Sequence, residues 1–114
     1  MDTIDSPSPY AYTGPQTLQQ PIEAALRRVV DPEMALSIVD VGLVHGVTVA
    51  AARVDVTMTM TSAACPVTDV IVADVEAELD RVLPPGLMLH VELVWDPAWT
   101  PQRMSPKAKA FMGW

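Results

Sequence analysis

The sequence predicts an α+β fold, an α/β two-layer sandwich with helices on one face of a small sheet. Three patterns support this: an amphipathic helix pattern early in the chain, two alternating strands after it, and a second helix that leads into a last strand. The expected order is helix, strand, strand, helix, strand. With 114 residues, half of them hydrophobic, the chain matches one domain and can form its own core.

The first helix is expected from residue 17 or 20 to residue 30. Its apolar residues recur at helical spacing and form one stripe: Leu18, Ile22, Ala25, Leu26 and Val29. Pro21 suits a first helical turn, and Pro32 disfavours helical backbone at Asp31. Residues 1–16 are rich in proline and small polar residues, so we expect a flexible lead there and a single domain over residues 17–114.

Two strands are expected at residues 42–50 and 53–61, joined by a short turn. The second alternates, with Val54, Val56, Met58 and Met60 on one face and Asp55, Thr57, Thr59 and Thr61 on the other. Such a pattern is typical of a half-buried strand.

A second helix is expected over residues 66–83, with Pro66 at its first position. Its predicted core face contains Val67, Val70, Ile71, Val75, Leu79 and Val82. A last strand over residues 87–95 follows. The Trp- and Pro-rich residues 95–101 should pack back on the domain, and Ser105, Pro106 and Gly113 bracket a short terminal helix.

Charge and cysteine content exclude several classes of protein. The formal net charge is −7, which argues against a nucleic-acid binder and against binding to an anionic membrane surface. The chain has neither a secretion-signal pattern nor an apolar run long enough to cross a membrane. One cysteine excludes an internal disulfide and fits a reducing compartment, so we expect a cytoplasmic protein.

Cys65 is the leading candidate for a functional residue. It lies where a strand ends and a helix begins, and the positive end of a helix dipole stabilises a thiolate. This position favours a nucleophile or a metal ligand, although nearby Asp69 opposes thiolate formation. A buried, inert cysteine is the plainer interpretation.

Asp31 and Glu33 are the second candidates, because a turn places two carboxylates two residues apart. They could bind a metal or orient a partner group. Alternatively, Asp31 caps a helix end and Glu33 is solvated. His45 and His90 lie within predicted strands without a neighbour at metal-ligand spacing, so packing or surface roles are expected, as for the tryptophans.

Several motifs occur together in a recognisable order. These are DPEMALSIVDVGLV at 31–44, TMTMT at 57–61 before ACP at 64–66, VELVWDPAWTP at 91–101 and MS at 104–105. Over residues 18–112 the chain resembles the iron-sulfur cluster assembly domain family that includes PaaD-like and SufT-like proteins. The resemblance implies a role in maturing iron-sulfur proteins, with Cys65 as the key residue and Asp31, Glu33, Thr61 and Ser62 bordering its site. Ala64 departs from the glycine that often precedes this cysteine.

A cluster usually takes four ligands, mainly thiolates, whereas one chain here supplies one. We therefore expect Cys65 to bind iron or an iron-sulfur cluster transiently, within a homodimer or with a client. The expected partners are scaffold or carrier proteins and client apo-proteins, and the expected role is a carrier or adaptor rather than an enzyme. Two alternatives are a thiol enzyme, which lacks an evident Cys-His pairing, and an accessory subunit for assembly of a multicomponent oxygenase or other metalloenzyme. That subunit would bind no cluster and would dock through the Trp-rich segment and acidic helix.

Overall fold

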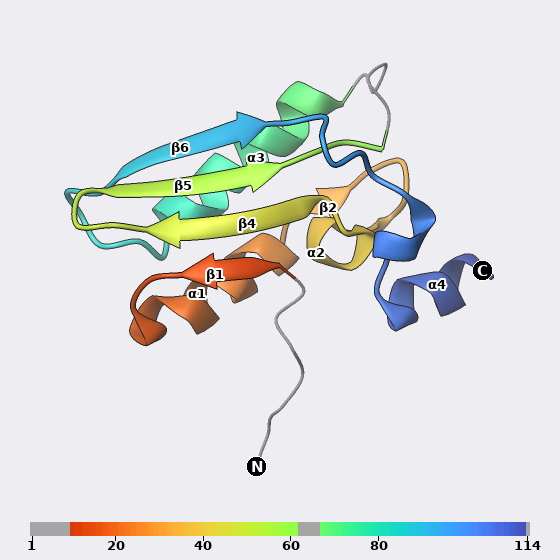
Figure 1. The fold of residues 1–114 in the computed structure, drawn as a ribbon, viewed down its shortest axis with the longest axis horizontal. Helices are drawn as coiled ribbons and strands as arrows, with labels where there is room; N and C mark the ends of the chain where they lie inside the picture. The colour runs from red at the N-terminus through yellow and green to blue at the C-terminus, as the bar shows by residue number, and fades with distance from the viewer. Residues whose placement is uncertain (1–9, 62–66, 114) are drawn as a thin grey trace, which may run out of the picture.

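A computed structural model describes residues 10–61 and 67–113 and confirms the α+β class. Four strands form one mixed sheet in the order β1-β4-β5-β6. Their bounds are Ala11–Thr13 (β1), Val44–Val49 (β4), Arg53–Met58 (β5) and Met88–Leu93 (β6). The β4–β5 pair is antiparallel, whereas β1 pairs with β4, and β6 with β5, in parallel. Helices α1 and α3 cover one face of this sheet (Figure 1).

Strand β1 was not predicted from the sequence. Residues 1–16 were expected to form a flexible lead, yet Ala11–Thr13 pair with β4 and Tyr10 is buried. Burial raises the pKa of the Tyr10 hydroxyl well above its ordinary value. A three-residue strand is too short to show a period-two pattern. The prolines on either side of it also favoured the interpretation as a flexible lead.

Helix α1 spans Gln16–Arg27, and its Ile22, Ala25 and Leu26 are buried as predicted. The expected position of Pro21 in the first turn is wrong, because the helix begins at Gln16 and Pro21 lies in its interior. The helix also ends before residue 30, since Val30 pairs with Ser37 in a two-stranded hairpin. Helix α1 therefore ends at Arg27, before Asp31, the residue whose backbone Pro32 restricts.

The alternation along β5 is confirmed for the face that packs on the helices, where Val54, Val56 and Met58 are fully buried. Thr59 departs from it: expected on the polar face, it is 0% exposed. Strand β5 ends at Met58, after which the Thr59 N–H donates to the Leu43 carbonyl at 2.8 Å. Period-two alternation stops with the strand, so Met58, Thr59 and Met60 are buried in succession.

Helix α3 spans Thr68–Asp80 and buries Ile71, Val75 and Leu79, which are spaced four residues apart. Val70 was expected on this face but is 53% exposed, because its place in the helix turns it about 100° from Ile71. Pro66, expected as the first helical residue, lies outside the described residues. None of the described helices is long and apolar enough to cross a membrane.

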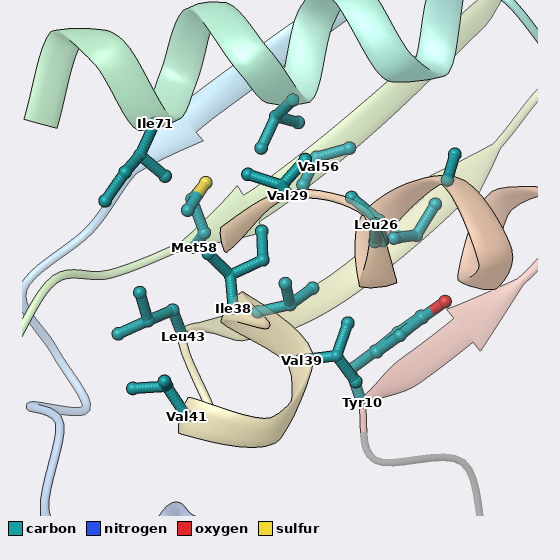
Figure 2. Packing of buried hydrophobic residues seen from close by; sticks show 14 of the residues in the cluster. Tyr10, Leu26, Val29, Ile38, Val39, Val41, Leu43, Val56, Met58 and Ile71 are labelled. Carbon is teal, nitrogen blue, oxygen red and sulfur yellow. The ribbon is translucent and has the colours of Figure 1, made fainter. Parts of the chain in front are cut away.

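Short elements that the periodicity did not predict connect α1 to β4. Strands β2 (Val30–Asp31) and β3 (Leu36–Ser37) form an antiparallel hairpin, and α2 (Ile38–Val41) follows. The terminal helix was predicted correctly: α4 (Pro106–Met112) is capped by the Ser105 hydroxyl and by left-handed Gly113. The short 3-10 helix η1 (Pro101–Arg103) that precedes it was not predicted. Figure 2 shows the core that joins these parts, with Val29, Ile38 and Leu43 packed near Met58 and Ile71.

Candidate functional site

The acidic turn is the part of the predicted site that the structure describes most fully. Asp31 is 1% exposed, and its Oδ1 accepts the Glu33 N–H at 2.9 Å. This bond from a side chain to the backbone two residues on is an Asx turn, a local preference of aspartate. Asp31 therefore does not cap a helix end, which was the alternative interpretation; it closes the β2–β3 hairpin. Glu33 is exposed, as that alternative expected.

The backbone of the same turn is tightly wound. The Asp31 carbonyl accepts N–H groups from Met34 at 3.2 Å and from Ala35 at 2.7 Å. Ala35 has a φ of 59°, in the left-handed region that residues with a Cβ atom rarely adopt. Such a conformation persists only where the surroundings determine it. The backbone conformation of the turn that carries Glu33 is therefore set by the fold.

The segment after β5 carries the polar residues that precede the cysteine. Thr59 is held by its bond to Leu43 and Met60 is buried, whereas Thr61 is partly exposed. The Thr59 Oγ1 is buried and has no hydrogen-bond partner within residues 10–61 and 67–113. Sequence reasoning missed this buried hydroxyl because it assigned Thr59 to the polar face of a strand.

Cys65 and Ser62 lie outside the described residues, so their predicted places in the site remain predictions. Helix α3 begins at Thr68, three residues after Cys65 in the sequence. Val67 at its N-cap position has no side-chain acceptor for the first-turn N–H groups. In the sequence, residues 62–66 immediately precede Val67 and so the positive end of a 13-residue helix.

The described parts of the predicted site lie on the same side of the molecule. In Figure 1 the chain that leaves β5, strand β2 and the N-terminal end of α3 all lie to the right of the centre of the view. Figure 2 shows the packing behind them, where Val29, Met58 and Ile71 lie in the same part of the core. Asp31 comes two residues after Val29, and Thr61 three after Met58. Strand β2, which ends at Asp31, and the residues that follow β5 therefore lie on the same side of the molecule, and the grouping of Asp31, Glu33 and Thr61 around one site stays a prediction.

Other candidate ligands do not gather within the described residues. No group of three or more His, Asp or Glu side chains that could hold a metal ion occurs in residues 10–61 and 67–113. His90 is exposed on β6, and His45 contacts Arg103 and the Pro97 carbonyl. Both histidines thus have the packing or surface roles that were predicted.

The Trp-rich segment packs on the domain, as expected. The Trp99 indole N–H donates to the Val41 carbonyl at 2.7 Å, and its ring packs against the core. Arg103, which sequence reasoning did not single out, donates from Nε to the Gly42 carbonyl at 3.0 Å. Trp99 therefore has an internal role, which weakens the idea that it forms a docking surface. Trp95 keeps 46% of its surface exposed.

A family model and two named relatives all relate this chain to iron-sulfur protein maturation. Residues 19–92 match the family model described as iron-sulfur cluster assembly protein. The chain is 39% identical over 99 residues to YitW of Bacillus subtilis (strain 168), named an Fe-S protein maturation auxiliary factor, covering 86% of this chain and 96% of that protein. It is 40% identical over 86 residues to SufT of Staphylococcus aureus (strain USA300), named likewise, covering 75% and 97%.

A solved structure extends the likeness to three dimensions. A domain of unknown function from Bacillus anthracis superposes with a TM-score of 0.80 at 38% identity, covering 86% of this chain and 93% of that one. The family match spans the acidic turn, β5, Cys65 and α3, which are the parts from which the site was predicted. The chain belongs to the iron-sulfur cluster assembly protein family.

Proposed function

We propose that this protein assists the maturation of iron-sulfur proteins as a carrier, binding iron or a cluster transiently through Cys65 and passing it to client apo-proteins. The observation that carries the proposal is the family match over residues 19–92, which contains Cys65 and the acidic turn. Relatives covered over 96% and 97% of their length bear the name Fe-S protein maturation auxiliary factor, which supports the same role for this chain.

Helix α3 supports the choice of Cys65 as the ligand. A thiolate is the form that binds iron, and a helix N-terminus favours negative charge within its first turn. Residue 65 is three positions from the first helical residue. Asp69, in the first turn, acts in the opposite direction, so the proposal does not require a permanently ionised thiol.

The acidic turn and the polar loop would border the cargo. Asp31 is committed to the hairpin through its bond to the Glu33 N–H, so its role is to hold the turn. We assign the contact with iron or with a client's groups to Glu33, which is an exposed residue of that turn. Thr61 and Ser62 would supply hydroxyl groups on the cysteine side.

The count of thiolates determines the type of complex. A cluster commonly takes four ligands, and the 114 residues contain one cysteine. Cys65 would therefore share the cluster with a second copy of the chain, or with a scaffold or client. Incomplete ligation suits a carrier, because incoming client thiolates can displace one Cys65 thiolate by simple ligand exchange.

Anaerobic reconstitution followed by transfer to an apo-enzyme that needs a [4Fe–4S] cluster tests the proposal. Reconstituted wild type should restore the activity of the client. With Cys65→Ser, the rate at which this activity returns should be no higher than with iron and sulfide alone. Glu33→Gln should slow the transfer several-fold, whereas Glu76→Gln, a matched change on the exposed side of α3, should leave it unchanged. Equal transfer by wild type and Cys65→Ser would disprove the role of the cysteine.

A further inference from the structure

Residues 97–105, here called the C-terminal strap, pack against α2 and the start of β4 and are hydrogen-bonded to them. Trp99 and Arg103 donate to the carbonyls of Val41 and Gly42, and the Ser105 N–H donates to the Asp40 carbonyl at 2.8 Å. All three bonds end on consecutive backbone carbonyls at the end of α2. The strap is thus held along one short stretch of backbone.

His45 provides a further contact to the strap, and a β-bulge places it there. The register of β4 against β5 shifts between Val44 and Gly46, so His45 is the extra residue of the bulge. Bulges redirect side chains relative to a regular strand. The redirected imidazole contacts the strap at two points: Nδ1 lies 2.8 Å from Arg103 Nη2, and Nε2 lies 3.1 Å from the Pro97 carbonyl oxygen.

These two contacts require one protonation state of His45. Arginine is always a donor, so Nδ1 must accept and carry no proton. A carbonyl is always an acceptor, so Nε2 must carry the proton. A second proton on Nδ1 would face the Arg103 guanidinium, which replaces a hydrogen bond with repulsion between two cations.

The surroundings of the imidazole favour the neutral state. Partial burial and the positive charge of Arg103 lower the pKa of His45 below its ordinary 6.5, and the hydrogen bond to the Pro97 carbonyl partly opposes this. Arg103, from η1, is the charged side chain that acts on the ring among the described residues, and the segment after β6 presents the Pro97 carbonyl.

We propose that His45 and Arg103 form a pH-sensitive latch, which holds the C-terminal strap closed while His45 is neutral and loosens it when His45 is protonated. Because the folded state disfavours the proton, stability contributed by the latch is complete above pH 6.5 and is lost as the pH falls below that value, through the lowered pKa of the folded state.

The latch lies next to backbone that supports the candidate site. Leu43, the residue after the strap contact at Gly42, accepts the Thr59 N–H at 2.8 Å. Thr59 begins the segment that leads through Thr61 toward Cys65. Loosening the strap should therefore give this segment more freedom. That consequence depends on the proposed function, whereas the latch itself does not.

Nuclear magnetic resonance tests the latch without reference to iron. The chain has two histidines, so His90→Gln leaves His45 as the remaining imidazole, and its nitrogen signals can be followed through pH 7.5 to 4.5 together with the Trp99 indole N–H. We expect a midpoint below 6.5. The Trp99 signal should move with the same midpoint, and its exchange with solvent should become about tenfold faster relative to Trp95.

His45→Gln removes the titrating group and should abolish the pH dependence of the Trp99 signal. Should that variant fail to fold, the His90→Gln protein still gives a decisive result. A His45 midpoint at or above 6.5, or a Trp99 indole signal that does not follow the His45 titration, would overturn the latch.

Discussion

The β2–β3 hairpin and the C-terminal strap lie at the same end of the molecule but are held in different ways (Figure 1). The hairpin is closed by bonds between residues two to four positions apart, from Glu33 and Ala35 to Asp31. The strap is held by bonds that span 52 to 65 positions, such as Pro97 to His45, Trp99 to Val41 and Ser105 to Asp40. The hairpin can therefore form locally, whereas the strap needs the folded domain beneath it.

This difference predicts where substitutions act. In the hairpin the buried carboxylate of Asp31 is the main determinant, so damage should be local and should depend on one side chain. The strap depends on how closely its backbone approaches α2 and β4. The substitutions with the largest effects on it should be those that change the shape of the surface on which it rests.

Gly42→Ala should have the largest effect. A Cβ atom at Gly42 would overlap the Arg103 carbonyl, and the residue has a φ of +88°. We expect a loss of about 3 kcal/mol in the free energy of unfolding, measured in urea. Gly86→Ala is the matched control, because its φ is +93° with no atom within 4 Å of the added Cβ. Gly86→Ala should lower the free energy of unfolding by about 1 kcal/mol, because it adds backbone strain without a steric overlap. Equal losses would show that the strap does not rest on Gly42.

Asp31→Ala should come next, with a loss of about 2 kcal/mol. It removes the acceptor of the Glu33 N–H from a fully buried position. Asp31→Asn keeps an acceptor oxygen and should recover part of the loss. Asp74→Ala, at an exposed position on α3, should change stability by less than about 0.5 kcal/mol. If the Asp31 and Asp74 variants unfold at the same urea concentration, the hairpin is not held by this carboxylate.

Trp99→Phe should cost about 1 kcal/mol, because it keeps most of the ring and removes the N–H that donates to Val41. Hydrogen exchange should show the loss mainly in residues 97–105 and in α2, with the hairpin unaffected. Trp95→Phe is the control at a half-exposed position and should be nearly neutral. Loss of protection in the hairpin would mean that the two regions open together.

Arg27→Gln should have the smallest effect, below about 0.5 kcal/mol. Asp40 Oδ1 accepts from Ser105 Oγ at 3.0 Å and from Arg27 at 3.3 Å, and the Arg27 side chain is well exposed. An exposed ion pair contributes little and is screened by salt. Urea denaturation of wild type and Arg27→Gln at low and high salt measures the contribution of this ion pair to the free energy of unfolding. A loss above 1 kcal/mol would assign the anchoring of α4 to Arg27 rather than to Ser105.

The same contrast explains how much could be predicted from the sequence. The helix and strand order, the alternation along β5 and the caps of α4 depend on local periodicity and local bonds, and each was confirmed in outline. Asp31–Pro32 correctly indicated a turn for the same reason. Strand β1 was missed because it is short and is stabilised by pairing with β4, more than 30 residues away.

Long-range contacts also account for what was missed near the site. Arg103 carries no local signal, since its partners Gly42 and His45 are 61 and 58 positions away. The predicted strand was extended three residues too far, to Thr61, and so included Thr59, because the end of pairing at Met58 depends on neighbouring strands. The residues expected to border Cys65 came from the family resemblance, and their grouping around that cysteine stays a prediction.

The central claim is that one Cys65 thiolate per chain holds the cargo. Native mass spectrometry after anaerobic reconstitution tests it most directly, because the mass reports how many chains accompany each cluster. The account predicts clusters on two copies of the chain, or on one copy joined to a client, and none on Cys65→Ser. A cluster retained by a lone chain, or by the Cys65→Ser protein, would contradict it.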